Sequence, residues 1–149
     1  MIHVVLFEPE MAGNVGSVAR TCAVLGATLH LVRPFGFHLR DAAVQRSAMD
    51  YLEHLNWHEH RDWQALRDFA GPQARFFGFS AHATRRYTEP RYQPGDYLVF
   101  GPESRGLPAW LRAEVDLLTF PMPGQGRSLN LAVSAAVGAF EAMRQLHAW

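Results

Sequence analysis

Residues 98–108 read Leu98-Val-Phe-Gly-Pro-Glu-Ser-Arg-Gly-Leu-Pro108, and residues 120–130 read Phe120-Pro-Met-Pro-Gly-Gln-Gly-Arg-Ser-Leu-Asn130. Each stretch joins a short apolar run, which predicts a buried strand, to a loop rich in Gly and Pro. Such a loop bends its backbone and leaves peptide N–H groups free to bind a ligand. The loops also carry Glu103, Ser128 and Asn130, whose side chains are not needed to pack the neighbouring elements. We therefore expect a ligand site where the two loops meet.

Strand-like and helix-like segments alternate along the rest of the chain. Strands are predicted at residues 2–7, 28–32, 55–58, 75–79, 97–100 and 115–120, and helices at 15–25, 62–69 and 129–147, with 40–47 also readable as a helix. Asn14 and Asp62 are well placed as N-cap residues. Strands separated by helical crossovers indicate an α/β fold, with a mostly parallel sheet covered by helices on both faces. A chain of 149 residues fits one domain spanning residues 1–149.

The composition narrows the classes of function. Basic and acidic residues number 14 each, so no net charge points to a polyanionic partner, and any nucleic-acid contact must be local. All the basic residues are arginine, whose planar guanidinium suits phosphates and base edges, although genomic composition can produce the same bias. Cys22 is the only cysteine, which excludes a disulfide framework. Without a signal-peptide pattern or a membrane-spanning apolar run, we expect a cytoplasmic protein with no membrane partner.

The sequence also excludes several common kinds of site. In open α/β sheets, ligands bind beyond the carboxyl ends of the strands, where the loops after 2–7, 97–100 and 115–120 all fall. The stretch 124–129 begins like a dinucleotide fingerprint but has Leu129 instead of the third glycine, and a chain without lysine has no P-loop. Residues 78–82 lack the last glycine of a nucleophile elbow.

Three segments each allow two interpretations. His54, His58 and His60 could cluster on a short element as a metal site would require, but ordinary surface or half-buried histidines are the simpler interpretation. One side of the last helix carries only small side chains. This would allow either a helix of a second subunit or the protein's own sheet to pack closely against it. Its small residues are Ala132, Ala135, Ala136, Gly138 and Ala139.

The third such segment lies between the strands predicted at 75–79 and 97–100. Arg85, Arg86 and Arg91 flank Tyr87 and Tyr92 there. Arginines interleaved with tyrosines suit phosphate contacts and stacking on the bases of a nucleic acid. A solvated loop explains the same residues equally well.

Three motifs resemble, in order, the signature motifs of the SPOUT RNA 2'-O-ribose methyltransferases. They are Asn14-x-Gly16-x-x-x-Arg20, Phe100-Gly-Pro-Glu-Ser-Arg-Gly-Leu-Pro108, and Pro121-Met-Pro with Arg127-Ser-Leu-Asn-Leu131. Further segments resemble the small single-domain branch that methylates the wobble nucleotide, position 34, of certain leucine tRNAs. They are Phe7-Glu-Pro-Glu10, Arg33-Pro-Phe-Gly-Phe37 and Asp50-Tyr51. The resemblance covers nearly the whole chain and implies a C-terminal trefoil knot, S-adenosylmethionine as cofactor, tRNA as substrate and an obligate homodimer.

The resemblance also implies roles for individual residues at the cofactor site. The residues expected around the cofactor are Phe79, Gly101, Phe120, Met122, Ser128 and Leu129. Core and turn packing is the alternative for all of them, and for the two phenylalanines taken alone it is favoured. The methyl group of a sulfonium is already activated, so the transfer needs no metal.

Arg20 is implied as the catalytic arginine that contacts the target ribose and its phosphate. An arginine side chain stays protonated at neutral pH, so the proton acceptor is left open. Asn14 would shape the loop that presents Arg20, or be a plain N-cap. Glu103 would bind the loop of Arg127 or orient Arg20, or be a turn carboxylate. Ser128 and Asn130 would bond the cofactor and the ribose, or cap the last helix.

The resemblance implies that Arg127 and Phe140 contact the RNA. Phe140 stands where wobble-modifying relatives can carry a tyrosine, so a hydroxyl used there would be missing. Two alternatives stay open. One is the same chemistry at another tRNA position, such as 18 or 32, and the other is a non-catalytic RNA-binding module of the same fold.

Overall fold

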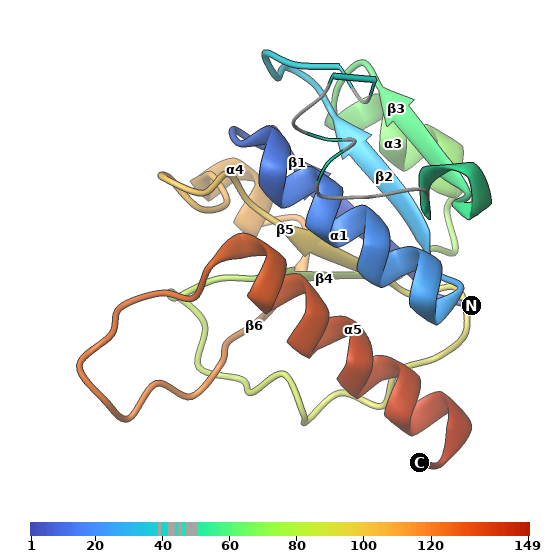
Figure 1. The fold of residues 1–149 in the computed structure, drawn as a ribbon. Coiled ribbons are helices and arrows are strands. Elements are labelled where there is room, and N and C mark those ends of the chain that lie inside the picture. The colour runs from blue at the N-terminus through green and yellow to red at the C-terminus, as the bar shows by residue number, and fades with distance from the viewer. Residues whose placement is uncertain (39, 42–43, 45, 47–50) are drawn as a thin grey trace.

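The computed structural model describes residues 1–38, 40–41, 44, 46 and 51–149. Within these residues, strands form one sheet in the order β3-β2-β1-β5-β4-β6, and every neighbouring pair is parallel (Figure 1). The strands are β1 (His3–Phe7), β2 (Thr28–Val32), β3 (Trp57–His60), β4 (Phe76–Phe79), β5 (Tyr97–Phe100) and β6 (Asp116–Leu118). The predicted parallel sheet is therefore confirmed.

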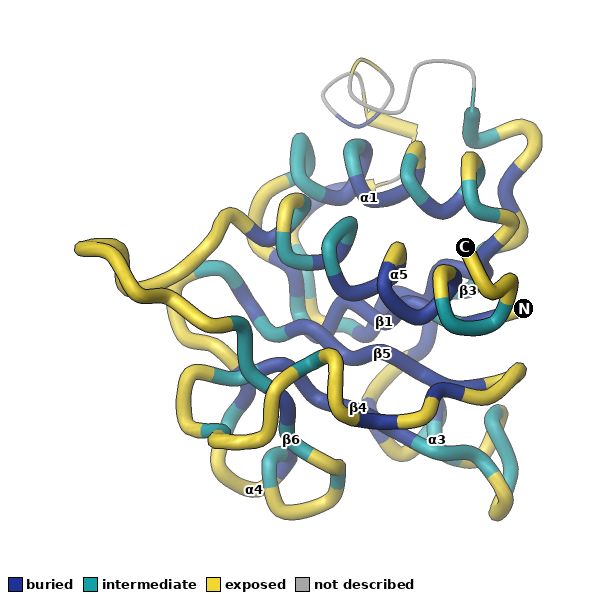
Figure 2. Tube along the Cα trace, turned by 90° about the horizontal axis from the view of Figure 1, so that it is seen from below, coloured by how far each residue is buried: buried dark blue, intermediate teal, exposed yellow. Residues whose placement is uncertain are grey.

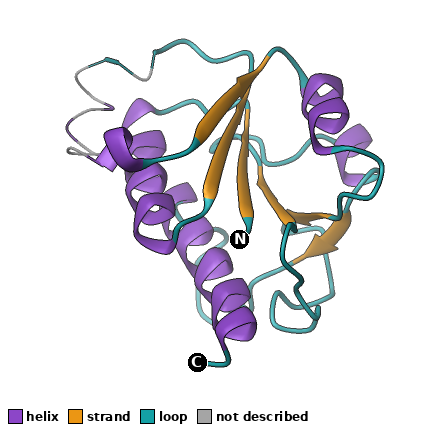
Figure 3. Cartoon of the chain, turned by 90° about the vertical axis from the view of Figure 1, so that its right-hand side faces the viewer, coloured by secondary structure: helices purple, strands orange, loops and turns teal. Residues whose placement is uncertain are grey.

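Helices cover both faces of this sheet (Figure 3). One face carries α1 (Ala12–Leu25) and α5 (Leu131–His147), with the 3-10 helix η1 (Tyr51–His54) beside α1, and the other carries α3 (Trp63–Ala70) and the short α4 (Ala109–Arg112). Each face has its own buried apolar cluster, and Figure 2 shows the inner strands β1, β5 and β4 as a buried layer. The predicted α/β class with two covered faces is thus confirmed. No helix in the described part of the chain could cross a membrane.

The small residues of α5 face the sheet. A Cβ atom placed on Gly138 would lie 3.0 Å from Cζ of Phe79 on β4, so a larger residue would push the helix away. Ala135 and Ala139 are each 1% exposed. Of the two interpretations of this side of the helix, packing on the protein's own sheet is the one confirmed.

The start of α1 differs from the sequence-based prediction. The helix begins at Ala12, and Met11 is its N-cap residue without a capping side chain. Asn14 therefore lies inside the first turn, and the prediction that it caps the helix is wrong. The physical reason is that a carboxylate from a distant loop binds the free amides at this end, as described below for the site.

Two other boundaries can be compared with the predictions. Asp62 caps α3 as expected, because its carboxylate accepts a 2.9 Å hydrogen bond from the amide of Ala65. The strand predicted at 55–58 is β3, which begins at Trp57. The helix predicted at 40–47 falls largely outside the described residues.

The tyrosines between β4 and β5 are held against the core. Tyr92 is 4% exposed and its hydroxyl donates a hydrogen bond to the carbonyl of Tyr87, whose ring centre lies 4.9 Å from that of Phe120. The ring of Tyr92 is thus not available for stacking on a base, and that part of the prediction is wrong. Arg85 and Arg86 in the same segment are exposed.

Histidines form a hydrogen-bonded chain on the face that α3 covers. Nδ1 of His3 on β1 lies 2.9 Å from Nε2 of His30 on β2, and Nδ1 of His30 lies 2.9 Å from Nε2 of His60 on β3. A neutral imidazole has one donor and one acceptor nitrogen, so an uncharged His30 can donate to one neighbour and accept from the other. Burial, together with the nearby His3, His60 and His58, lowers the pKa of His30 to about 3.

This chain predicts a loss of stability in weak acid. The unfolded protein protonates His30 near pH 6.5, whereas the folded protein resists protonation, so the free energy of unfolding falls as the pH drops below 6.5. Between pH 7 and pH 5 the loss due to His30 is roughly 2 kcal/mol. Urea unfolding at the two pH values measures it, and His30→Leu should have a shallower pH dependence. Equal stability of the wild type at both pH values would contradict the expectation.

Candidate functional site

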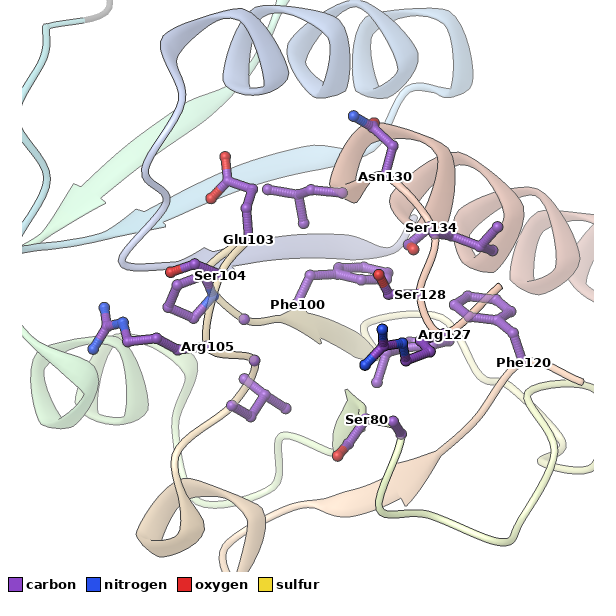
Figure 4. A pocket seen from close by; sticks show the side chains of 18 of the residues that line it. Ser80, Phe100, Glu103, Ser104, Arg105, Phe120, Arg127, Ser128, Asn130 and Ser134 are labelled. Atoms are coloured by element: carbon purple, nitrogen blue, oxygen red, sulfur yellow. The ribbon is translucent and has the colours of Figure 1, made fainter. Parts of the chain in front are cut away.

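A cavity of about 700 Å³ lies at the carboxyl ends of β4, β5 and β6 (Figure 4). Its walls are the loops after these strands and the beginnings of α1 and α5. The structure thus brings the two Gly- and Pro-rich loops together. The sequence-predicted residues that line the cavity are Asn14, Phe79, Gly101, Glu103, Phe120, Met122, Arg127, Ser128, Leu129 and Asn130.

Arg20 and Phe140 are not among the described residues that line this cavity. Arg20 is exposed on α1, and its guanidinium carbon lies 5.6 Å from the ring centre of Tyr51. Six positions separate it from Asn14, about one and two-thirds helical turns, so the two side chains leave α1 on different sides. Phe140 is 46% exposed on α5. One copy of the chain therefore does not bring these two residues to the cavity.

Aromatic rings form the apolar part of the cavity. Phe79 lies between Phe100 and Phe120, with ring centres 4.5 Å and 5.2 Å away and nearly parallel planes. Phe79 is 8% exposed and also contacts α5, so it belongs to the core and to the cavity wall at once. A flat apolar group of a ligand can pack against such a surface.

Gly101 allows the loop after β5 to fold back on itself. A Cβ atom at this position would lie 2.5 Å from both the carbonyl carbon of Gly106 and the amide nitrogen of Leu107. Real side chains do not approach backbone atoms this closely, so only glycine fits. The result is a closed turn whose backbone lines the cavity, as expected for a loop that binds a ligand through peptide groups.

Glu103 holds the start of α1 rather than an arginine. Its carboxylate accepts hydrogen bonds from the amides of Glu10 at 2.8 Å and Met11 at 2.9 Å, and from Nδ2 of Asn14 at 3.1 Å. A carboxylate at this end of a helix satisfies free N–H groups and opposes the positive end of the helix dipole. The expectation that Glu103 binds the loop of Arg127 or orients Arg20 finds no such contact among the described residues.

Asn14 connects this group to the second loop. Its Oδ1 accepts a 3.2 Å hydrogen bond from Nδ2 of Asn130. Asn130 is also the N-cap residue of α5, because its Oδ1 accepts from the amides of Ala132 and Val133. The capping alternative for Asn130 is therefore correct, and α5 begins at Leu131. These bonds join the starts of α1 and α5 to the loop after β5.

The loop after β4 is a part of the wall that sequence reasoning missed. Ser80 and His82 line the cavity, and the amide of His82 donates a 3.1 Å hydrogen bond to Oγ of Ser80. The signal that points to them is their place directly after a predicted buried strand.

Two arginine side chains, those of Arg105 and Arg127, line this cavity. Figure 4 shows Arg127 directed into the cavity and Arg105 directed away from it. Arg105 forms an ion pair with Glu8 at 3.2 Å. No group of His, Cys, Asp and Glu side chains in the described part of the chain could hold a metal ion. The cavity thus offers an aromatic surface, exposed peptide groups and hydroxyl, amide and guanidinium groups.

Comparisons with known proteins agree with one another. The profile of the SpoU rRNA Methylase family matches residues 1–140. A tRNA (cytidine(34)-2'-O)-methyltransferase of Burkholderia pseudomallei is 44% identical over 149 residues, which cover 97% of this chain and 96% of that protein.

Solved structures are similar over the same length. One, described as giving structural insights into the 2-OH methylation of C/U34 on tRNA, has a TM-score of 0.97 and 47% identity, and covers 100% of this chain and 98% of its own. The SpoU methyltransferase AviRb from Streptomyces viridochromogenes, in complex with the cofactor AdoMet, has a TM-score of 0.86 and 26% identity over 99% of this chain and 61% of its own. The profile match and the close relatives together show that the chain belongs to the SpoU rRNA Methylase family.

Proposed function

We propose that this protein transfers a methyl group from S-adenosylmethionine to the ribose 2'-hydroxyl of nucleotide 34 in tRNA. The observation that carries the proposal is that residues from all three sequence motifs line one cavity at the carboxyl ends of β4, β5 and β6. Similarity to a tRNA (cytidine(34)-2'-O)-methyltransferase over 97% of the chain supports the substrate. The expected leucine tRNAs, the trefoil knot and the cytoplasmic location stay predictions from the resemblance.

The residues present fit S-adenosylmethionine. The cavity of about 700 Å³ is within the range of small-molecule sites, and its aromatic surface at Phe79 and Phe120 suits an adenine ring. The turn at Gly101, which a Cβ atom would disrupt, presents peptide groups to the polar edges of the ligand. When bound, the sulfonium supplies a methyl group that the ribose oxygen can attack directly.

The protein's own residues then have to orient the ribose and let its proton leave. Holding two reactants in line can account for roughly 7 to 11 kcal/mol of a reaction barrier. Arg20 is assigned the contact with the ribose and its phosphate, which uses the charge and planar shape of the guanidinium. Ser128 and Asn14 hold polar positions at the cavity wall from which the ribose can be positioned.

A second copy of the chain would complete the site. Arg20 lies away from the cavity of its own chain, so it acts on a bound ribose only if another subunit presents it. The outer sides of α1 and α5 leave large apolar side chains in water, including Val24 at 61%, Val133 at 47% and Phe140 at 46% exposure. A homodimer through these helices would cover them and would bring Arg20 of one subunit to the cavity of the other.

Arginines beside the cavity are suited to the tRNA backbone. Arg86 forms a parallel bridge with Thr119, which lines the cavity, and the amide of Thr119 donates a 2.8 Å hydrogen bond to the carbonyl of Arg85. Both side chains are exposed and form no ion pair among the described residues. A fixed backbone that presents free guanidinium groups next to the site favours phosphate contacts.

Binding of the methyl donor should depend on Gly101. Gly101→Ala places a Cβ atom against Gly106 and Leu107, so the turn opens and affinity for S-adenosylmethionine falls at least tenfold in calorimetric titration. The matched control is Gly124→Ala, where a Cβ atom meets nothing within 4 Å. A wild type that binds no donor would contradict the proposed function and leave a non-catalytic RNA-binding module.

Methyl transfer should depend on Arg20. Arg20→Ala should abolish methylation of nucleotide 34, mapped by mass spectrometry, while donor affinity stays near that of the wild type. Mixing Arg20→Ala subunits with Gly101→Val subunits tests the dimer, because half of randomly paired dimers then hold one intact site, and about a quarter of wild-type activity returns. No recovery would exclude action across subunits, and methylation mapped to another position would correct the assigned nucleotide.

Replacing Arg85 and Arg86 together by Ala should weaken tRNA binding and make it less sensitive to salt. Each phosphate contact contributes about 0.7 to 0.9 to the slope of log affinity against log salt concentration, so the slope should become shallower by about one to two. Arg61→Ala is the control, since this side chain is 85% exposed at the opposite edge of the sheet. An unchanged slope in the double variant would show that these arginines do not contact phosphates.

A further inference from the structure

Two acidic residues, 93 positions apart in the chain, bind each other's loops. The carboxylate of Glu10, in the loop after β1, accepts hydrogen bonds from the amide of Ser104 at 2.7 Å and from its hydroxyl at 2.8 Å. The carboxylate of Glu103, in the loop after β5, accepts from the amides of Glu10 and Met11 at 2.8 Å and 2.9 Å. We call these four bonds the double clamp.

The clamp carries charge on both sides. Bonds from N–H and O–H groups to an ionised carboxylate are shorter and stronger than bonds between neutral groups. The hydrogen bonds from Ser104 are the main reason why the pKa of Glu10 is lowered. An ion pair between Glu8 and Arg105 at 3.2 Å links the same two loops.

Of the two clamp carboxylates, only that of Glu103 belongs to a residue of the cavity wall. Met11, Glu103 and Ser104 line the cavity, whereas Glu10 is not among the described lining residues. The loop that contains Ser104 is closed at one end by the contact of Gly101 with Gly106 and Leu107. Glu10 lies in the loop after the neighbouring strand β1, and from there it fixes the outer part of the same loop.

We propose that Glu10 is a positioning residue for the methyl donor. It acts through Ser104, without touching the donor, and holds residues 101–107 in the donor-binding shape before the donor arrives. A loop fixed in advance loses less conformational freedom on binding, and the affinity rises accordingly. This inference rests on the proposed function, because it assumes that the ligand of the cavity is S-adenosylmethionine.

The test separates donor binding from the chemical step. Glu10→Ala removes both bonds to Ser104 and should weaken S-adenosylmethionine binding about tenfold in calorimetry. The backbone amides before α1 still donate their hydrogen bonds to Glu103, so the rate of tRNA methylation at saturating donor should stay within about twofold of the wild type. Glu10→Gln keeps one acceptor oxygen and should restore part of the affinity. Ser104→Ala, which removes only the hydroxyl donor, should cause a smaller loss.

A double-mutant cycle and a control complete the design. If Ser104 acts through Glu10, the loss in the Glu10→Ala/Ser104→Ala variant should equal that of Glu10→Ala alone. The control is Glu59→Gln, which weakens the exposed ion pair with Arg33 at 2.6 Å near the other edge of the sheet and should leave donor affinity unchanged. Melting temperatures of all variants separate a general loss of stability from a loss of binding.

The outcomes distinguish this inference from the proposed function. Wild-type affinity in Glu10→Ala, or losses that simply add in the double variant, would overturn the role of Glu10 while the function stands. A wild type without affinity for S-adenosylmethionine would overturn both. If Glu10→Ala does not fold, Glu10→Gln and Ser104→Ala decide the question, since each keeps part of the clamp.

Discussion

Parallel pairing of β5 with β1 on one side and β4 on the other places three strand ends next to one another. Because the strands run the same way, the loops that follow them leave from one edge of the sheet, and segments far apart in the sequence meet there. The cavity wall and the double clamp both depend on this arrangement. If β5 did not pair with β1, Glu10 and Ser104 would not lie next to each other.

The close approach of α5 to the sheet is a second requirement. Gly138 lets the helix lie directly on Phe79, which is also part of the aromatic surface of the cavity. The start of the helix is thereby brought to Asn14, where Asn130 bonds both its own helix and α1. Packing in the core and the shape of the site are thus set by the same contacts.

Much of this could be predicted from sequence patterns, because apolar runs and capping residues act locally. Asp62 caps its helix as expected, and the two Gly- and Pro-rich loops meet because parallel strands require it. The patterns failed where a partner comes from far along the chain. Asn14 is a residue type that favours the N-cap, but α1 begins at Ala12 without a side-chain cap, and the Asn14 side chain instead binds Glu103, 89 positions away. Tyr92 is buried against Phe77 on β4. Strand order is equally non-local, since periodicity does not say which strands pair. In the proposed homodimer, Arg20 and Phe140 act on the site of a neighbouring subunit, and the sequence of one chain carries no geometric signal for that contact.

The order of the strands also has a consequence for biosynthesis. β3, β2 and β1 pair within the first 60 residues, but the remaining edge of β1 is closed only by β5, which begins at Tyr97. While the ribosome is still making the second half, the nascent chain therefore exposes an unpaired, largely apolar strand whose backbone is open to pairing with other chains. The central strand of the finished enzyme is an edge strand for much of its translation, and this interval is when aggregation or chaperone capture competes most strongly with folding.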